Sequence, residues 1–262
     1  MEQIHTDKDA NNSHELPFAA PCKRLELHAP FKWLKLGFAD IKRAPRQSLS
    51  YGAAMVFISL LVSAIALRFG NFYSLLTMLS GFIFIGPLIA IGLYSISCQL
   101  QLGKKPILGY CLREGQRQWG NTLLFAMVML VVFMVWARAA SMLYVFFPMH
   151  SNATWQEYAT FLSIGTFVGA IFSAIIFCAS AFSLPMIMDR KVDMVTAIVT
   201  SVNAVLRNKK VMLLWATLIF VSLIIGFATA FIGLLFLMPL IGHATWHAYQ
   251  ETIEASAWPD HD

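Results

Sequence analysis

The sequence is poor in charge and lacks the motifs that mark common soluble enzymes. Only 13% of its 262 residues are charged, whereas 58% are hydrophobic. Because soluble domains carry about 25% charged residues, this composition excludes a water-soluble enzyme, a disordered chain and a fibrous repeat. The phosphate-loop, dinucleotide-binding, nucleophile-elbow and HExxH patterns are also absent. Nothing in the sequence therefore indicates a catalytic site.

Cysteines are few and widely separated. Cys22, Cys98, Cys111 and Cys178 form no CxxC pair. This spacing indicates neither a disulfide framework nor a zinc site. We expect isolated thiols that pack as small apolar side chains.

Long stretches without charge decide the class of protein. Residues 47–67, 69–103, 158–188 and 211–250 carry no charge, and residues 118–156 carry one, Arg138. A helix crosses the bilayer with about 20 mostly apolar residues. The sequence therefore predicts an all-α, polytopic membrane helix bundle with six transmembrane helices, over residues 48–67, 74–99, 121–141, 160–188, 211–226 and 228–249.

The predicted crossings contain no Asp or Glu. Proton- or sodium-coupled pumps usually place such carboxylates within the membrane. This absence argues against cation-coupled transport, and it leaves a passive, anion-related or lipid-related role open.

Basic residues mark one side of the membrane. Of the 19 Lys and Arg residues, 17 lie before the first crossing or in the connections after the second and fourth. The positive-inside rule places these segments and both termini in the cytoplasm. We attribute the net charge of +5 to contacts with anionic lipids at that face, and we expect no nucleic-acid partner. The predicted organisation is a flexible cytoplasmic tail (1–29), a six-span membrane domain (30–252) and a short cytoplasmic tail (253–262).

Three amphipathic helices are predicted in the cytoplasmic segments, over residues 31–43, 107–119 and 192–206. The apolar face of the first comprises Trp33, Leu34, Gly37, Phe38 and Ile41. The apolar face of the third comprises Val195, Ile198, Val202 and Val205, opposite Asp193, Thr196, Thr200 and Asn203. Amphipathic helices with basic flanks commonly lie in the headgroup plane, so we expect all three to be interfacial. Asp193 is placed to cap the last of them.

Each amphipathic helix precedes a pair of crossings, which predicts a threefold internal repeat. Residues 53–60 align with residues 216–223 at a constant offset, and the second crossing of each pair carries one proline: Pro87, Pro185 and Pro239. A proline frees a backbone carbonyl and kinks a helix. The repeat fits either duplication of a stable packing unit or a transporter with its site at the repeat interface.

Four segments resemble a bacterial integral-membrane family, domain of unknown function 2189. They are PFKWLKLGFADIKRAPRQSLSY (30–51), GFIFIGPLIAIGLYSIS (81–97), SLPMIMDRKVDMVTAIVTSVNAVLRNKKVMLLWA (183–216) and LIGHATWHAY (240–249). The resemblance spans about residues 25–252. It implies a multipass protein of the bacterial inner membrane without a settled activity, although some members carry the label of a cytochrome c oxidase subunit.

The histidines test that label. A catalytic haem–copper oxidase subunit resembles a twelve-span protein with six histidine ligands, and here only His243 and His247 fall in or beside a crossing. Two histidines cannot hold two haems and a copper, so we exclude a catalytic oxidase subunit. An accessory or assembly role stays open.

His243 and His247 are also the best candidate ligands in the chain, because residues four apart share a helix face. Zinc sites need three or four protein ligands, and no Cys, Asp or Glu near this pair in the sequence completes such a set. The alternatives are an interfacial pair beside Trp246 and Tyr249, a metal or haem site, and a proton-linked role. We expect the interfacial pair and no bound cofactor.

Arg138 is the one charge within the predicted third crossing. It lies roughly 26 Å along the helix from Trp119, so we expect it near the outer interface, where its side chain can reach water. If Arg138 instead lines a cavity of the bundle, it is the best candidate for binding an anion.

These features favour a non-enzymatic membrane protein that scaffolds, assembles or stabilises a complex or the membrane. Its partner would be another membrane protein or a second copy of the chain. The alternatives are a small-molecule or lipid transporter and a haem- or copper-binding accessory of a respiratory oxidase. A polar cavity at the membrane midplane, reached by Pro87, Pro185 and Pro239, would favour transport, whereas a closed apolar bundle would favour scaffolding.

Overall fold

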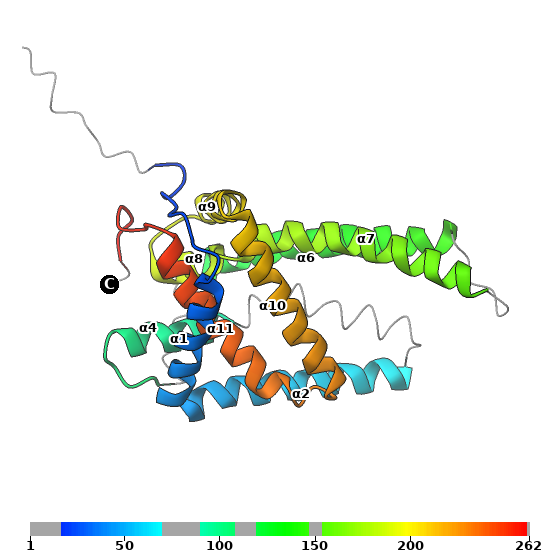
Figure 1. Cartoon of the computed structure of the whole chain (residues 1–262), viewed down its shortest axis with the longest axis horizontal. Helices are drawn as coiled ribbons and strands as arrows, with labels where there is room; N and C mark the ends of the chain where they lie inside the picture. The colour runs from blue at the N-terminus through cyan, green and yellow to red at the C-terminus, as the bar shows by residue number, and fades with distance from the viewer. Residues whose placement is uncertain (1–16, 70–89, 108–118, 147–153, 261–262) are drawn as a thin grey trace, which may run out of the picture.

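The computed structural model describes residues 17–69, 90–107, 119–146 and 154–260, and these ranges form an all-α structure. Figure 1 shows long helices projecting from one end of the molecule, where shorter helices and both ends of the described chain gather. The helices are α1 (Ala29–Arg43), α2 (Pro45–Phe69), α4 (Ile91–Gln101), α6 (Trp119–Phe146), α7 (Trp155–Ser180), α8 (Ser183–Asp189), α9 (Met194–Arg207), α10 (Lys209–Ala228) and α11 (Leu234–Thr252). The predicted all-α class is confirmed.

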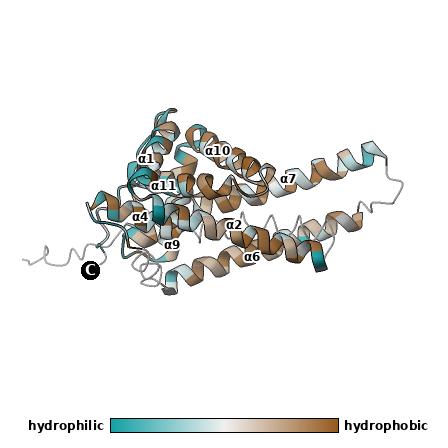
Figure 2. Ribbon diagram, turned by 90° about the horizontal axis from the view of Figure 1, so that it is seen from below, coloured by the Kyte–Doolittle hydropathy of each residue, from teal (hydrophilic) through white to brown (hydrophobic). Residues whose placement is uncertain are grey.

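Four stretches of the described residues are long and apolar enough to cross a membrane. They are Pro45–Ile65, Gly120–Leu143, Trp155–Asp189 and Lys209–Ala228, and they correspond to the first, third, fourth and fifth predicted crossings. Figure 2 shows hydrophobic residues along most of α2, α6, α7 and α10. The chain is therefore a multipass integral membrane protein.

The other two predicted crossings differ from these four. Of the crossing predicted over 74–99, residues 70–89 lie outside the described residues, and its end forms α4. The crossing predicted over 228–249 begins with a turn, and α11 starts only at Leu234. Helix α11 is not among the candidate spans, because its second half carries His, Trp, Tyr, Gln and Glu side chains.

The fourth predicted crossing is broken next to its proline. Helix α7 ends at Ser180, α8 begins at Ser183, and Pro185 lies in the first turn of α8, where a proline is tolerated. The backbone N–H of Phe182, left free by the break, donates to Ser201 Oγ at 3.1 Å. Pro239 lies inside α11, and Pro87 lies outside the described residues.

The first amphipathic helix packs against protein on the face that was predicted to be interfacial. In α1, Trp33, Gly37 and Ile41 are buried. A Cβ on Gly37 would lie 2.8 Å from the backbone nitrogen of Ala244 and 2.9 Å from the carbonyl oxygen of Leu240, so α1 and α11 are in backbone contact. Helix α11 therefore covers part of the predicted apolar face, whereas Phe38 of the same face is 40% exposed.

The third amphipathic helix buries residues of both predicted faces, with Val205 on one and Thr200 on the other. In α9, Thr196 and Thr200 are buried, whereas Val195 is half exposed. Thr200 Oγ1 accepts a hydrogen bond from Ala20 N at 3.0 Å. Small polar side chains therefore form the protein-facing side of α9, as they commonly do between membrane helices.

The helix cap predicted at Asp193 is confirmed. Asp193 precedes α9, and its carboxylate accepts a hydrogen bond from Thr196 N at 2.9 Å. Partial burial acts to raise the pKa of Asp193, but the backbone hydrogen bond from Thr196 opposes it, and the resulting pKa lies below the ordinary value. The ionised carboxylate thus stabilises the start of this helix.

The first and third units of the predicted repeat share one local architecture. Helix α1 is joined to α2 by the single residue Ala44, and α9 is joined to α10 by the single residue Asn208. In both units a short amphipathic helix thus meets a long apolar helix at a one-residue corner. The corresponding corner of the second unit falls within residues 108–118, outside the described residues.

Both ends of the described chain pack onto the same end of the molecule. Lys23 N donates to Thr252 O at 2.8 Å, and Glu254 N donates to Pro21 O at 3.0 Å. Arg190 pairs with Asp260. Residues 17–28 and 253–260, which the sequence assigned to tails, therefore contribute to the packed body.

Candidate functional site

A buried polar cluster joins four helices around His243. Asp40 comes from α1, Ser48 from α2, Ser97 from α4 and His243 from α11. We use the name histidine network for this cluster with the residues that extend it: Asp40, Ser48, Ser97, Gln101, His243, Trp246 and His247.

His243 lies at the centre of the network and is fully buried. Its Nδ1 atom lies 2.7 Å from Ser97 Oγ, and its Nε2 atom lies 2.9 Å from Ser48 Oγ. Both ring nitrogens therefore have hydroxyl partners, so the cost of burying the ring's polar atoms is offset.

Asp40 is the buried acid of the network, with an exposed fraction of 3%. Its Oδ2 atom accepts a hydrogen bond of 2.8 Å from Ser97 Oγ and lies 2.8 Å from His247 Nε2. A buried carboxylate is costly unless it is hydrogen bonded. These two contacts tie α1 to α4 and α11.

The protonation pattern of the network follows from its connections. A carboxylate only accepts, so Ser97 donates to Asp40, and its oxygen is left to accept from the Nδ1–H of His243. A hydroxyl can donate or accept, so Ser48 fits either protonation state of Nε2. Because burial disfavours the charged ring, we expect the neutral Nδ1–H tautomer, with Nε2 accepting from Ser48.

The network reaches the surface at Gln101. Its Nε2 atom lies 3.4 Å from His247 Nδ1, and its Oε1 atom accepts a hydrogen bond of 2.9 Å from Trp246 Nε1. Gln101 is exposed, whereas Trp246 is buried. One end of the chain of hydrogen bonds thus lies in the interior at Ser48 and the other lies at the surface.

A second set of contacts fixes the first half of α1. Trp33 is fully buried, and its Nε1–H donates to Glu251 Oε2 at 2.8 Å. Lys32 pairs with the other oxygen of Glu251 at 3.0 Å. Trp33 also meets Trp215 of α10 edge-on, with ring centroids 5.5 Å apart. Helix α1 is thus attached to α11 at its start, its middle and its end.

The structure brings the predicted pair, His243 and His247, together with the carboxylate of Asp40. Within the described ranges, no group of three or more His, Cys, Asp or Glu side chains is arranged to hold a metal ion. For His243 to ligate a metal or haem, it would have to release Ser48 or Ser97.

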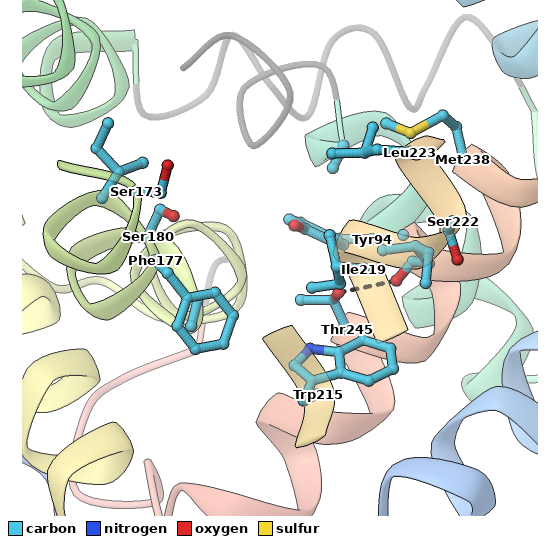
Figure 3. A pocket seen from close by; sticks show the side chains of 15 residues that line it. Tyr94, Ser173, Phe177, Ser180, Trp215, Ile219, Ser222, Leu223, Met238 and Thr245 are labelled. Carbon is cyan, nitrogen blue, oxygen red and sulfur yellow. Dashed lines mark hydrogen bonds between the residues drawn. The ribbon is translucent and has the colours of Figure 1, made fainter. Parts of the chain in front are cut away.

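Arg138, Pro185 and Pro239 make none of the contacts of the network, and Pro87 lies outside the described residues. Arg138 is exposed on α6. A cavity of about 160 Å³ lies between α7, α10 and α11, and its lining is mostly apolar (Figure 3). Neither Pro185 nor Pro239 lines it. This cavity is therefore not a polar one reached by Pro185 or Pro239.

Sequence reasoning missed Asp40, Ser48 and Ser97. Asp40 lies seven residues after Trp33, about 20° from it around the helix, in the middle of the buried face. One acid in an otherwise basic helix, aligned with a tryptophan and a glycine, was the available signal. The two serines gave none, because hydroxyl side chains are common in membrane helices.

Comparison with known proteins gives a family and nothing more specific. No curated protein matches the chain, and no solved structure matches it. A family model described as "Predicted integral membrane protein (DUF2189)" matches residues 75–189. Of the histidine network, only Ser97 and Gln101 fall within the matched range. Over residues 75–189 the chain thus matches domain of unknown function 2189, the integral-membrane family that its sequence resembles.

Proposed function

We propose that the protein is a non-enzymatic component of the bacterial inner membrane that scaffolds or stabilises a membrane assembly. The observation that carries the proposal is the closed hydrogen bonding of His243, whose two ring nitrogens both contact serine hydroxyls. A catalytic imidazole must reach its substrate, directly or through a hydroxyl that it activates, whereas His243, Ser48 and Ser97 are all fully buried. The network instead joins helices, so its role is to fix α1 on α11.

A rigid end of the molecule is suited to holding a partner. The packed body at this end includes α1, α11 and the segments around Lys23 and Glu254. Its surface presents basic residues of α1 together with exposed Phe31 and Phe38. We propose anionic lipids and a membrane-protein partner or second copy as its ligands.

Native electrophoresis of solubilised membranes tests the scaffold role. We expect the protein to migrate in a discrete assembly, and we expect that assembly to disappear when the gene is deleted. His243→Ala, which loosens α1, should weaken the assembly, whereas Arg138→Gln should leave it intact. Migration as a monomer, with every membrane complex unchanged by deletion, would contradict the role.

The proposed topology has six crossings with both termini in the cytoplasm. The basic segments before α2 and around Arg190 meet at one end of the molecule, which supports a common side. Labelling with a membrane-impermeant thiol reagent tests it in single-cysteine variants, with wild-type labelling subtracted. We expect Ile232→Cys to react from outside, and Lys105→Cys and Ala257→Cys to react only after permeabilisation. If Ile232→Cys and Ala257→Cys react from the same side, α11 does not cross.

A lipid-related role is the second candidate, and the apolar cavity favours it over transport of a polar solute. A haem or copper accessory role finds no comparable support in the described contacts, because His243 is already engaged at both nitrogens. An absorption spectrum of the purified protein tests the haem proposal: a Soret band would support it, and a spectrum without one would remove it.

A further inference from the structure

The cavity shown in Figure 3 lies within the membrane-crossing part of the protein. Its walls come from α7 and α10, which are both candidate spans, and from α11. Ala90 and Tyr94, at the start of α4, also line it. A ligand that enters from the bilayer therefore meets this cavity between two helices whose outer faces are apolar.

The cavity is elongated along the helices. Its lining runs from Ser173 to Ser180 on α7 and from Trp215 to Leu223 on α10. Eight residues of helix correspond to about 12 Å. The cavity is therefore a slot along the helices, long enough for an extended segment of hydrocarbon chain.

The chemistry of the lining selects an apolar ligand. Most of the lining is apolar, and it includes Ile176, Phe177, Ile219, Leu223 and Ile241. An apolar cavity of about 150 Å³ stays dry and binds small hydrocarbons. In a bilayer the abundant hydrocarbon is the acyl chain of a phospholipid.

Hydroxyl groups are scattered along the slot. Tyr94 and Ser180 lie on opposite sides of it (Figure 3), and both residues are buried. Ser173 and Ser222 also line it, the latter near Leu223 and Met238. Thr245 and Ser222 donate their hydroxyls to the carbonyl oxygens of Ile241 and Leu218, so the surface left for a ligand is mostly apolar.

We propose that this cavity binds one acyl chain of a membrane phospholipid. The inference is independent of the scaffold role, because the lipid can be retained as a structural ligand or exchanged with the bilayer.

Lipid retention tests the proposal on the full-length protein. The protein is purified in detergent, supplied with phosphatidylglycerol that carries a dibrominated acyl chain, washed and examined by native mass spectrometry. We expect wild type to retain one lipid per chain. Ser173→Phe places a ring in the slot and should reduce retention at least tenfold. Ser163→Phe makes the same change at an exposed site of the same helix and should retain the lipid.

Tryptophan fluorescence gives a second readout that needs no filling variant. Trp215 lines the cavity, so bromines on a bound chain should quench its emission. We expect bromolipid to quench wild type more than Trp215→Phe. Any of three results would overturn the proposal. They are equal quenching of wild type and Trp215→Phe, equal lipid retention by Ser173→Phe and Ser163→Phe, and no retained lipid in wild type. The protein could then remain a scaffold, because native electrophoresis tests that role separately.

Discussion

Replacing Gly37 with alanine should destabilise the protein, although alanine is the better helix former. A Cβ at this position would lie 2.8 Å from Ala244 N and 2.9 Å from Leu240 O. Both atoms belong to the backbone of α11, so neither can move aside without displacing the helix. The variant therefore forces α1 away from α11 and strains the contacts of Trp33 and Asp40 on either side.

The expected size follows from two opposing effects. Alanine in place of glycine in a helix stabilises by roughly 0.5–1 kcal/mol, and overpacking a close contact costs about 1–3 kcal/mol. Gly165 of α7 provides the matched control, because a Cβ there would meet no described atom within 4 Å. Both variants share the helix effect, so the difference between Gly37→Ala and Gly165→Ala isolates the packing cost, about 1–3 kcal/mol.

Denaturation of the purified protein in detergent measures this difference. In a chain of this size, each kcal/mol corresponds to roughly 2–4 °C in Tm. We expect Gly165→Ala to unfold at or above the wild-type temperature and Gly37→Ala to unfold below it. Equal stability of the two variants would show that α1 and α11 are not in backbone contact, and it would refute the packing described for α1.

Four further predictions concern single side chains. Asp40→Leu leaves Ser97 and His247 without their acceptor. Each unsatisfied donor costs about 1–3 kcal/mol, and the partly exposed His247 costs less, so we expect the free energy of unfolding to fall by about 2–4 kcal/mol. Asp40→Asn should lower it by a smaller amount. Thr200→Val removes the acceptor of Ala20 N and should make residues 17–28 sensitive to limited proteolysis. Arg138 lies toward one end of a candidate span and is not buried by the described helices; because we expect its side chain to reach water at the outer interface, Arg138→Gln should change stability by no more than about 0.5 kcal/mol. The pKa of Asp193 is lower in the folded protein than in the unfolded chain. Its cap therefore stabilises the fold above the unfolded pKa, and this stabilisation is lost as pH falls through the folded pKa. Asp193→Ala should cost about 1 kcal/mol of stability at neutral pH and little in acid, and an effect independent of pH would be evidence against the cap.

The membrane-crossing helices could be predicted well, because length and missing charge are local properties. Four predicted crossings match candidate spans within a few residues. Broken helices were less predictable. Pro185 indicated a kink near the end of the fourth crossing, but the sequence did not show that Ser201 of another helix would accept the freed amide of Phe182.

The orientation of the amphipathic helices could not be predicted from hydrophobicity. In α1 the predicted apolar face includes Phe38, which is 40% exposed, whereas the polar residue Asp40 is buried. In α9 Val195 of the apolar face is half exposed, whereas Thr200 of the polar face is buried. Bilayer lipid is as apolar as valine, so in such proteins small or hydrogen-bonded residues face the neighbouring helix.

The histidine network depends on contacts between distant segments. Asp40 meets His247 across 207 residues of sequence, and Ser48 meets His243 across 195. The spacing of His243 and His247 indicated a shared helix face. It gave no information about Ser48 and Ser97, which hydrogen bond to His243. In the folded protein, His243 and His247, which the sequence offered as candidate ligands, form hydrogen bonds between helices.

The most direct test of a structural role for this network is the tautomer of His243, measured by ¹⁵N NMR of histidine-labelled protein, with His243→Asn to assign the signal. The account predicts a neutral Nδ1–H imidazole that stays unchanged between about pH 5 and 8, the range in which free histidine titrates. A His243 signal that titrates within this range, or one that shifts on addition of copper or zinc, would contradict the account and identify the site as proton- or metal-binding.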